Sequence, residues 1–427
     1  MDYINTIDPG INLFDKFNDI YSCDMYDIPS VNDKFYLFKK SNLSVLCFNI
    51  RSFSKNIEEF SAFTESSKIE FDIIILVETW VTPSTLPLCV IDGYHGFHSI
   101  RQDKKCGGVS IFIKDNYQCH ENLCINNETL ELITVNVEIS ESESIDVVGL
   151  YRPPNGNILN FNNKLEHTFN ELKIRSNNTI IGGDFNICLF KGENDVNVSS
   201  FINLMSSFSF VPYITLPTRE CNNSKSLIDN IWSNMSSISH AGVFDIHISD
   251  HYPIFAMFDN YKNNINDIVK VQFRDFSESN LANFKNEVLL ADWFSGSTDV
   301  NSMTSSFIDR LDKIYNKCFP IKTKNIGVKR LRKPWLTNGI IKCINEKHKL
   351  YKMVKLSLCS DLYYSRYRNM LTTIIRNSKE LYFKNKFDKA TSSIKKTWKL
   401  INDIMGLNRN KNKNVRLKIN DSFIDKS

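Results

Sequence analysis

Carboxylate, amide and imidazole side chains recur along the first 260 residues of this 427-residue chain, each at or just after the end of an apolar run. Carboxylate and amide oxygens are the ligands that hard divalent cations such as Mg²⁺ prefer. A histidine held by a carboxylate can bind a phosphate or move a proton. Metal-dependent hydrolysis of a phosphodiester needs this combination. The five motifs are Cys47-Phe48-Asn49, Val77-Glu78-Thr79, Gly183-Asp184-Phe185-Asn186, Leu227-Ile228-Asp229-Asn230 and Ser249-Asp250-His251.

Two of these residues could hold the cation. Glu78 follows the apolar run Phe71–Val77, and Asn49 follows the run Leu43–Phe48. A carboxylate at the end of a buried strand is held rigidly, as Mg²⁺ coordination requires, and Asn49 can ligate the same ion or orient Glu78. Taken singly, a surface glutamate and a turn-forming asparagine are simpler interpretations.

Asp184 and Asn186 lie two residues apart, directly after the run 179–183. This spacing can aim both side chains at one point if the strand has just ended. Asp184 can then activate a water or protonate a leaving oxygen, and Asn186 can bind a phosphate oxygen. The two glycines before them let the backbone approach a ligand, although a Gly-Gly-Asp turn explains the motif as well.

His251 needs a carboxylate on its second ring nitrogen to fix its tautomer. Asp229 is one candidate for this role. Asp250 is another, although it could instead face the metal. His247 has no predicted partner and is expected on the surface of a strand. An Asp-His pair alone is also common in turns.

Two loop segments could contact a phosphate backbone. Tyr151 and Arg152 end a strand just before Pro153-Pro154, where the tyrosine can donate a hydrogen bond to a phosphate and the arginine can pair with it. Thr218 and Arg219 could grip a nucleic-acid backbone in the same way. All four are also consistent with ordinary loop residues.

The elements that must position these groups are short strands rich in Val, Ile and Phe, with few helices between them. Such a pattern predicts an α/β four-layered sandwich, in which two packed β-sheets are flanked by helices, rather than one doubly wound sheet. Strands are predicted at Leu43–Ile50, Phe71–Val77, Gly108–Ile113, Leu130–Ile139, Ile145–Tyr151, Thr179–Gly182, Asn230–Trp232, Gly242–Ile248 and Pro253–Phe258, and helices at Lys55–Ser67, Ile158–Arg175 and Ser199–Phe208.

Beyond Phe258 the sequence turns polar and Asn-rich, and helical periodicity then dominates. From Ile321 onward, 27 Lys and Arg stand against 7 Asp and Glu, a net charge of +20, whereas the 25 basic and 41 acidic residues before it give −16. This predicts a polyanionic partner for the tail, unless the charges only solvate a helical face. The predicted regions are a lead-in at 1–42, the catalytic domain at 43–258, a linker with amphipathic helices at 259–330 and a basic helical segment with a loose end at 331–427.

The tail from Ile321 is expected to form helices that pack weakly on the preceding domain. Its interleaved aromatic residues could form the core of a helical hairpin, a docking face or part of a nucleic-acid surface. The 11 scattered cysteines include no CxxC pair, which indicates reduced thiols. No apolar run could span a bilayer, and Met1–Asp19 lacks the pattern of a signal peptide, so we expect a protein inside the cell without a membrane partner.

Taken together and in this order, the motifs resemble those of the endonuclease/exonuclease/phosphatase superfamily. More narrowly, they resemble the apurinic-type endonuclease domain of non-LTR (LINE-like, jockey-type) retrotransposons, over about Leu43–Phe258. The segment Arg332–Thr337 resembles the connection to reverse transcriptase in those elements, but no Tyr/Phe-x-Asp-Asp polymerase motif occurs. The matching motifs are Cys47-Phe48-Asn49-Ile50-Arg51-Ser52, Val77-Glu78-Thr79-Trp80, Gly149-Leu150-Tyr151-Arg152-Pro153-Pro154, Gly182-Gly183-Asp184-Phe185-Asn186, Ser226-Leu227-Ile228-Asp229 and Ser249-Asp250-His251-Tyr252-Pro253-Ile254.

The resemblance implies a Mg²⁺-dependent endonuclease, with Mn²⁺ as a substitute ion, that nicks one strand of duplex DNA and leaves a 3′-hydroxyl. It implies duplex DNA as partner, element RNA as a second partner of the basic tail, and action in the nucleus. The division of acid and base roles between Asp184 and His251 stays open. The implied roles are catalysis for Asp184, His251, Asp229, Tyr151 and Asn186, metal binding for Glu78, Asn49 and Asp250, and nucleic-acid binding for Arg51, Arg152, Thr218, Arg219 and Ser226.

Two alternatives remain. One is a phosphatase or phospholipase of the same superfamily, although inositol-phosphatase relatives usually have a Trp-Cys-Asp-Arg run where this chain has Leu227-Ile228-Asp229-Asn230. The other is a non-catalytic retrotransposon remnant that only binds nucleic acid, although no expected catalytic position is substituted.

Overall fold

The computed structural model forms two compact units. The larger unit combines residues 1–264 with 331–427, and the smaller unit spans Ile265–Arg330. Most of the predicted lead-in at 1–42 and of the loose end lies outside the described residues. These are 23–27, 43–67, 69–101, 106–140, 143–174, 177–221, 224–235, 238–259, 268–293, 299–327, 333–390, 393–404, 417–419 and 422–424.

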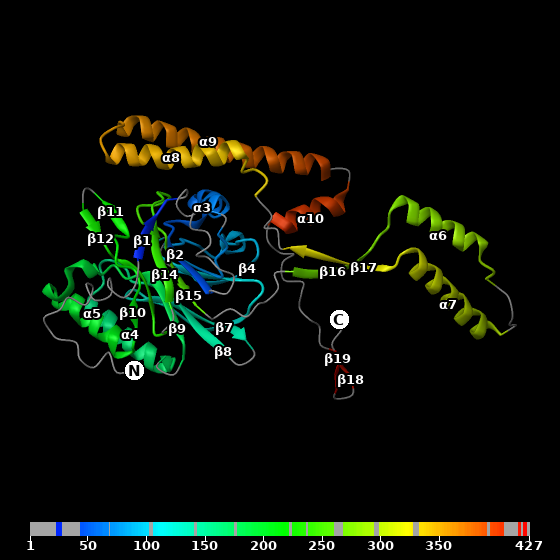
Figure 1. Ribbon diagram of the computed structural model, residues 1–427, viewed down its shortest axis with the longest axis horizontal. Helices are drawn as coiled ribbons and strands as arrows, with labels where there is room; N and C mark the ends of the chain where they lie inside the picture. Colours follow the sequence, from blue (N-terminus) through cyan, green and yellow to red (C-terminus); the bar gives the residue numbers. More distant parts are fainter. Residues whose placement is uncertain are drawn as a thin grey trace. The chain divides into compact units, whose positions relative to one another are not determined.

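Two mixed β-sheets form the centre of the larger unit (Figure 1). The first contains β1 (Cys23–Tyr26), β2 (Leu43–Asn49), β3 (Ile73–Val77), β4 (Tyr94–Ser99), β5 (Val109–Lys114), β14 (Ile238–Phe244) and β15 (Ile254–Phe258). The second contains β6 (Gln118–Asn126), β7 (Glu131–Ser140), β8 (Glu143–Tyr151), β9 (Thr179–Asp184), β10 (Val211–Pro212) and β13 (Asp229–Ser233). Their strand orders are β1-β14-β15-β2-β3-β5-β4 and β10-β13-β9-β8-β7-β6.

Strand β2 shows why the sheets stack. Leu43, Val45 and Cys47 belong to the large core that both sheets share, whereas Leu46 and Phe48 belong to a second core on the opposite face. Since successive side chains of a strand point to opposite faces, an entirely apolar strand is buried on both sides. The central strands of the first sheet must therefore be covered by the second sheet on one face and by a helix on the other.

Helices supply these outer layers. The ring of Phe60 in α3 (Phe53–Ser67) stacks on Phe48 of the first sheet, with 6.0 Å between ring centroids. On the second sheet, Phe201 of α5 (Val196–Ser207) meets Trp232 of β13 at 5.7 Å, and α4 (Ile158–Glu171) joins the same core. Two sheets flanked by helices confirm the predicted α/β sandwich. Short elements complete it: η2 (Leu86–Leu88), η4 (Leu189–Asn194), β11 (Arg219–Cys221) and β12 (Ser224–Ser226).

The C-terminal helices α8 (Asn338–Lys355), α9 (Asp361–Ala390) and α10 (Ile394–Ile404) belong to the same unit. Ile344 of α8 and Leu371 of α9 share a small core with Ala62 of α3. Glu58 of α3 accepts hydrogen bonds from Trp335 Nε1 and Lys379 Nζ, both at 2.8 Å. The expectation that this segment packs weakly is therefore wrong for α8 and α9, because it docks through both apolar and charged contacts.

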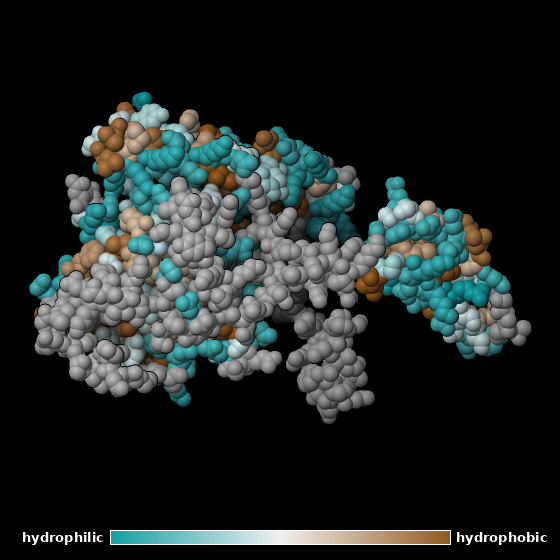
Figure 2. Space-filling view, in the orientation of Figure 1, coloured by the Kyte–Doolittle hydropathy of each residue, from teal (hydrophilic) through white to brown (hydrophobic). Residues whose placement is uncertain are grey.

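The outer surface of α8 and α9 is mostly hydrophilic in Figure 2, with hydrophobic patches among the teal residues. Among the described residues, no helix has the length and apolar character needed to cross a membrane. The cysteines in the described part of the chain are free, as expected for reduced thiols.

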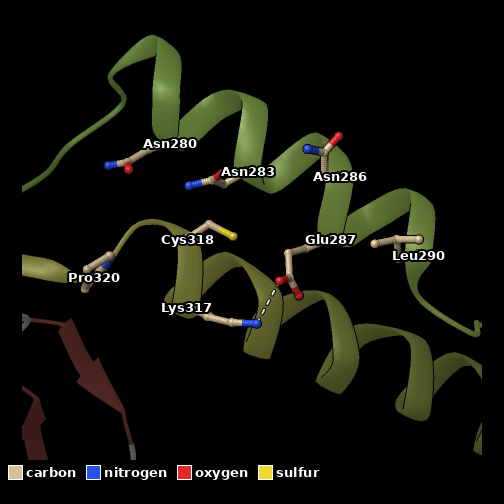
Figure 3. Close-up of a pocket in the computed structure, with 8 residues that line it drawn as sticks. All are labelled: Asn280, Asn283, Asn286, Glu287, Leu290, Lys317, Cys318 and Pro320. Atoms are coloured by element: carbon tan, nitrogen blue, oxygen red, sulfur yellow. Dashed lines mark hydrogen bonds and ion pairs between the residues drawn. The ribbon is translucent and has the colours of Figure 1, made fainter.

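The smaller unit is an antiparallel pair of strands, β16 (Ile268–Arg274) and β17 (Ile321–Gly327), joined through α6 (Glu278–Leu290) and α7 (Val300–Cys318). Helices were expected from Ile321 onward, but this first stretch pairs as β17. A pocket of about 560 Å³ lies between the two helices, where Lys317 Nζ meets Glu287 Oε1 at 2.7 Å (Figure 3). None of the predicted site residues lines it. A short hairpin near the C-terminus, β18 (Leu417–Ile419) and β19 (Ser422–Ile424), belongs to the larger unit.

Candidate active site

The predicted site residues gather where strand ends from both sheets meet. β2 runs parallel to β3, and β8 runs parallel to β9, so the carboxyl ends of each pair lie at one edge. Asn49 ends β2, Glu78 follows β3, and Tyr151 and Asp184 end β8 and β9. Asp229 opens β13 directly opposite Asp184. The topology thus brings together residues that are far apart in the sequence.

Asn49 joins the two sheets. Its buried Nδ2 donates to Glu78 Oε1 at 3.0 Å and to Asp184 Oδ2 at 2.9 Å. One amide therefore fixes a carboxylate of the first sheet against a carboxylate of the second. Asn49 Oδ1 is also buried and has no hydrogen-bond partner among the described residues. A buried polar atom without a partner is costly, so this oxygen is suited to a ligand.

His251 lies between two carboxylates. Its Nδ1 donates to Asp229 Oδ2 at 2.8 Å, and its Nε2 lies 3.9 Å from Asp184 Oδ2. All three side chains are almost completely buried. Of the two candidate orienting residues, Asp229 rather than Asp250 holds the ring.

Burial and charge together shift the pKa values of this cluster. Burial lowers the pKa of His251, but the charge and hydrogen bond of Asp229 outweigh it and, with Asp184 and Asp250, raise the pKa to about 9. Burial and the charge of Asp229 raise the pKa of Asp184 to about 7, against the opposing effect of His251. At neutral pH the His251 ring is therefore protonated on both nitrogens and positively charged. Asp184 can exist with or without a proton, as acid–base chemistry needs.

The structure places Thr218 inside the site rather than on a nucleic-acid surface. Its fully buried Oγ1 donates to Asp229 Oδ2 at 2.7 Å. The same oxygen accepts the N–H groups of Ile228 and Asp229 at 3.2 and 3.1 Å. Thr218 therefore cannot grip a nucleic-acid backbone from this position, because its hydroxyl fixes the carboxylate that holds His251.

Glu78 stands in a backbone conformation that is uncommon for residues with a side chain. Its φ is 51° and that of Trp80 is 54°. The turn is held because Thr79 and Trp80 donate their N–H groups to Gly108 and Gly107 at 3.2 and 2.9 Å. Trp80 Nε1 also donates to Glu78 Oε2 at 3.3 Å. Strain of this kind persists only where the surroundings enforce it, and it concentrates at functional sites.

Asn186 and Arg152 support the loop after β9. The Asn186 N–H donates to Asp184 Oδ1 at 2.9 Å, and its side-chain Nδ2 donates to the Arg152 carbonyl oxygen at 2.7 Å. Arg152 is only 2% exposed, and its Nη1 donates to the carbonyl oxygen of Asn186 at 3.2 Å. Arg152 thus braces the loop in place of the expected contact with phosphate.

Tyr151 supplies a hydroxyl at the same edge of the sandwich. Its side chain is buried, and this burial together with the charges of Glu78 and Asp184 raises the pKa of the hydroxyl. The hydroxyl therefore keeps its proton at neutral pH and can donate a hydrogen bond to an anionic group.

Asp250 lies between two arginines at the rim. Arg51 Nη1 is 2.6 Å from its Oδ1, and Arg219 Nη2 is 2.8 Å from its Oδ2. Burial raises the pKa of Asp250, but the charges of His251, Arg51 and Arg219 outweigh this effect and lower it. Ser226 Oγ donates to the Arg219 carbonyl oxygen at 3.4 Å, which supports that arginine from within the β11–β12 hairpin.

Two sets of side chains could hold a cation. Ligand atoms of Asp184, Asp229 and His251 lie within 4.8 Å of one another, but the contacts described above already use most of them. Glu78 and Asn49 offer a carboxylate and the amide oxygen that lacks a partner. Oxygen donors of this kind fit a hard divalent cation, so the second set fits best.

Comparison with known proteins bears on this site. Residues 145–255 match the family described as endonuclease-reverse transcriptase. The family resemblance predicted from the motifs is confirmed over these residues, which include Tyr151, Asp184, Asp229 and His251. Among curated proteins, no sequence matches this chain.

Solved structures resemble about half of this chain. The endonuclease domain of TRAS1, a telomere-specific non-LTR retrotransposon, is 16% identical with a TM-score of 0.43, over 52% of this chain and 100% of that chain. The AP endonuclease LMAP from Leishmania major is 15% identical with a TM-score of 0.43, over 51% and 88%. An AP endonuclease from Archaeoglobus fulgidus is 17% identical with a TM-score of 0.40, over 51% and 99%.

Three residues at or near the site had no predicted role. Trp80 holds Glu78, and Ser249 Oγ donates to the Asn49 carbonyl oxygen at 2.7 Å, which ties the His251 loop to β2. The serine of the Ser-Asp-His motif was an available signal for this contact. His247, expected on the surface of a strand, is buried in the loop before His251. Its partners in α8 lie about 100 residues later, so no local pattern could reveal those contacts.

Proposed function

We propose that this chain is a metal-dependent endonuclease that hydrolyses a phosphodiester bond in DNA. The observation that carries the proposal is the buried Asp184–His251–Asp229 array, one hydrogen bond away from the Asn49–Glu78 pair. Two carboxylates around one histidine, with both Asp184 and His251 shifted in pKa, are typical of an acid–base centre. The family match over residues 145–255 supports the same class of reaction.

Mg²⁺, or Mn²⁺ in its place, would be held by Glu78 and Asn49, with Asp250 as a further ligand once an arginine releases it. The ion would supply positive charge against the charge that develops on the phosphate. Asn49 Nδ2 and Trp80 Nε1 hold the Glu78 carboxylate for this task.

The remaining residues would transfer protons or bind the phosphate. Asp184, with a pKa near neutrality, would take a proton from the attacking water or give one to the leaving oxygen. His251 would present its protonated Nε2 to the phosphate or act as the acid, held by Asp229. Tyr151 would donate a hydrogen bond to a phosphate oxygen, and Asn186 would assist at the same group.

The proposed substrate is duplex DNA, cut in one strand so that a 3′-hydroxyl remains. Arg51 and Arg219 are partly exposed beside the site and could exchange Asp250 for a phosphate. The basic helices α8 to α10 would add affinity for the same DNA or for element RNA. Action on chromosomal DNA would place the protein in the nucleus.

A plasmid-nicking assay tests the proposal. The full chain should convert supercoiled plasmid to open circles with Mg²⁺, and EDTA should stop the conversion. Asp184→Asn keeps the shape of the side chain and should nick at least about 10²-fold more slowly. Nicking that persists in EDTA would refute the metal assignment. No nicking with either Mg²⁺ or Mn²⁺ would refute the nuclease, and release of phosphate from a soluble phosphomonoester would then favour a phosphatase.

A further inference from the structure

Helix α8 makes hydrogen bonds with the loop of residues 245–252, which carries His251. Lys347 Nζ donates to the His247 carbonyl oxygen at 3.2 Å, and the His247 N–H donates to His348 Nδ1 at 3.3 Å. Two consecutive side chains of α8 thus bind both backbone polar groups of one loop residue. Lys347 and His348 are both buried, so water competes little for these hydrogen bonds.

Side chains of the loop make a second set of contacts with α8. The ring centroid of His247 lies 4.2 Å from that of Tyr351 and 5.2 Å from that of Tyr252. Asp245 pairs with Lys352 of α8, and its Oδ1 lies 3.2 Å from His247 Nε2. A row of rings therefore leads from α8 to the residue next to His251.

α8 also reaches the hairpin on the other side of the site. Lys355 Nζ lies 2.9 Å from Glu220 Oε2 in β11. The neighbouring Arg219 pairs with Asp250 and forms a β-bridge with His251. One helix thus contacts both segments that flank the histidine.

The opposite contacts of α8 anchor it to the sandwich. Lys347 pairs with Glu59 of α3, and Ile340 and Ile344 share a core with Ala62. α3 itself begins directly after Arg51 and Ser52, close to the end of β2. A helix fixed on α3 can therefore restrain the loop that it touches.

We propose that α8 is a brace that holds the His251 loop in its working position, with His247, Tyr351 and Lys352 as positioning residues. This inference rests on the proposed function for its catalytic consequence. A loop that loses its buried contacts opens more often than the elements around it. Each opening of this loop would separate His251 from Asp229, so α8 makes the C-terminal segment a part of the catalytic unit.

Hydrogen exchange on the full chain tests the brace without any assay of activity. Tyr351→Ala should speed amide exchange of residues 245–252 about tenfold, roughly the effect of losing the contact between the half-buried Tyr351 ring and His247, and leave β2 and β3 unchanged. Tyr351→Phe keeps the ring and should restore the protection. Lys352→Gln, which leaves Tyr351 in place, should give a smaller increase, and Lys349→Gln, on an exposed position of the same helix, should give none. Unchanged exchange in both Tyr351→Ala and Lys352→Gln would overturn the proposal.

Nicking kinetics then test the catalytic consequence. Tyr351→Ala should lower kcat about fivefold to tenfold with KM changed less than about twofold, because the loop opens while the DNA contacts remain. Tyr351→Phe should recover kcat. Faster loop exchange with an unchanged kcat would show that α8 holds the loop without any effect on catalysis, and would overturn the inference that the C-terminal segment is a part of the catalytic unit. If the unmodified chain nicks no DNA, the proposed function fails, and the exchange experiment alone still decides whether α8 holds the loop.

Discussion

Two regions of the larger unit, around Asp184 and beneath α8, hold acidic side chains that are buried or partly buried. Beneath α8, acidic side chains pair with lysines. Burial raises the pKa of Glu58, but Lys333, Lys379 and Trp335 outweigh it and lower the pKa. Asp245 behaves in the same way, and the hydrogen bonds from His247 and Lys352 overcome its burial and lower its pKa to about 2. Both acids favour the folded state in their ionised form.

The pKa of Asp184 shifts in the opposite direction. Burial and the charge of Asp229 raise its pKa to about 7, so its ionised form is disfavoured in the folded protein. Glu78, two hydrogen bonds away, stands at a φ of 51°. Neither feature stabilises the fold. The acids under α8 therefore serve docking, whereas the strand ends hold an arrangement typical of functional sites.

The largest expected effect comes from the acid–base residues. Asp184→Ala or His251→Ala should reduce nicking by about 10²-fold or more, because each removes a proton-transfer or charge-stabilising group. Glu58→Gln beneath α8 serves as the comparison and should cost at most about tenfold, because it weakens only the docking of the C-terminal segment. Plasmid nicking and circular dichroism would be measured together. Equal losses at Glu58 and Asp184 would erase the distinction between the two regions.

A smaller effect is expected at Thr218. Thr218→Val keeps the shape but removes the hydroxyl that donates to Asp229 Oδ2, so kcat should fall about tenfold, as is usual when the support of a catalytic group is removed. Thr134→Val is the matched control, because Thr134 is equally buried but its Oγ1 has no hydrogen-bond partner among the described residues. Similar kcat values for the two variants would show that Thr218 does not position Asp229.

Mild acid should lower the stability of the protein through the region beneath α8. Burial and the charges of Lys347, His247 and Lys352 lower the pKa of His348 far below its usual value, against Asp245. Since its folded pKa is depressed, its contribution to stability is complete above about pH 6.5 and falls as the pH decreases, by about 1 kcal/mol per pH unit. His348→Asn keeps an acceptor for the His247 N–H and should lose less stability between pH 6.5 and 5. Urea unfolding at both pH values measures this. Parallel losses in the two proteins would contradict the assignment.

The smallest expected effect on hydrolysis lies in α10. Lys395, Lys396 and Lys399 are exposed, and replacing all three with Gln should leave kcat nearly unchanged. The log–log salt dependence of duplex DNA binding should become shallower by about 0.9 for each phosphate that the variant no longer neutralises. Lys285→Gln, Arg310→Gln and Lys313→Gln together form a control of equal charge in the smaller unit. The same slope in both triple variants would show that these lysines of α10 do not contact nucleic acid.

Much of the fold was predictable because the central strands are strongly apolar. Strand β2 was predicted to within a residue, since both of its faces are buried. Strand β6 was missed because it is largely exposed and its sequence is polar. Strand β17 was missed because its pairing partner β16 lies some 50 residues earlier. Local sequence patterns predict burial well, but they predict the pairing of distant strands poorly.

The candidate site was predictable as a set of residues but not as a set of contacts. The need of His251 for a carboxylate left Asp229 and Asp250 as candidates, and the family resemblance implied Asp229, which holds Nδ1 in the structure. Thr218 and Arg152 were assigned to nucleic acid, yet both are buried, since a sequence does not show which polar side chains turn inward. The contact between His247 and α8 depends on docking across about 100 residues, which no motif records.

Activation of water by the Asp184–His251 centre can be followed by hydrolysing plasmid DNA in ¹⁸O-labelled water with Mg²⁺ and analysing the two ends at the nick. If the Asp184–His251 centre activates water, each nick should carry a 3′-hydroxyl and a 5′-phosphate that contains one ¹⁸O atom. Asp184→Asn should form labelled product at least about 10²-fold more slowly. Nicks with a 3′-phosphate, a 5′-phosphate without label, or labelled nicks produced equally by Asp184→Asn would contradict the account.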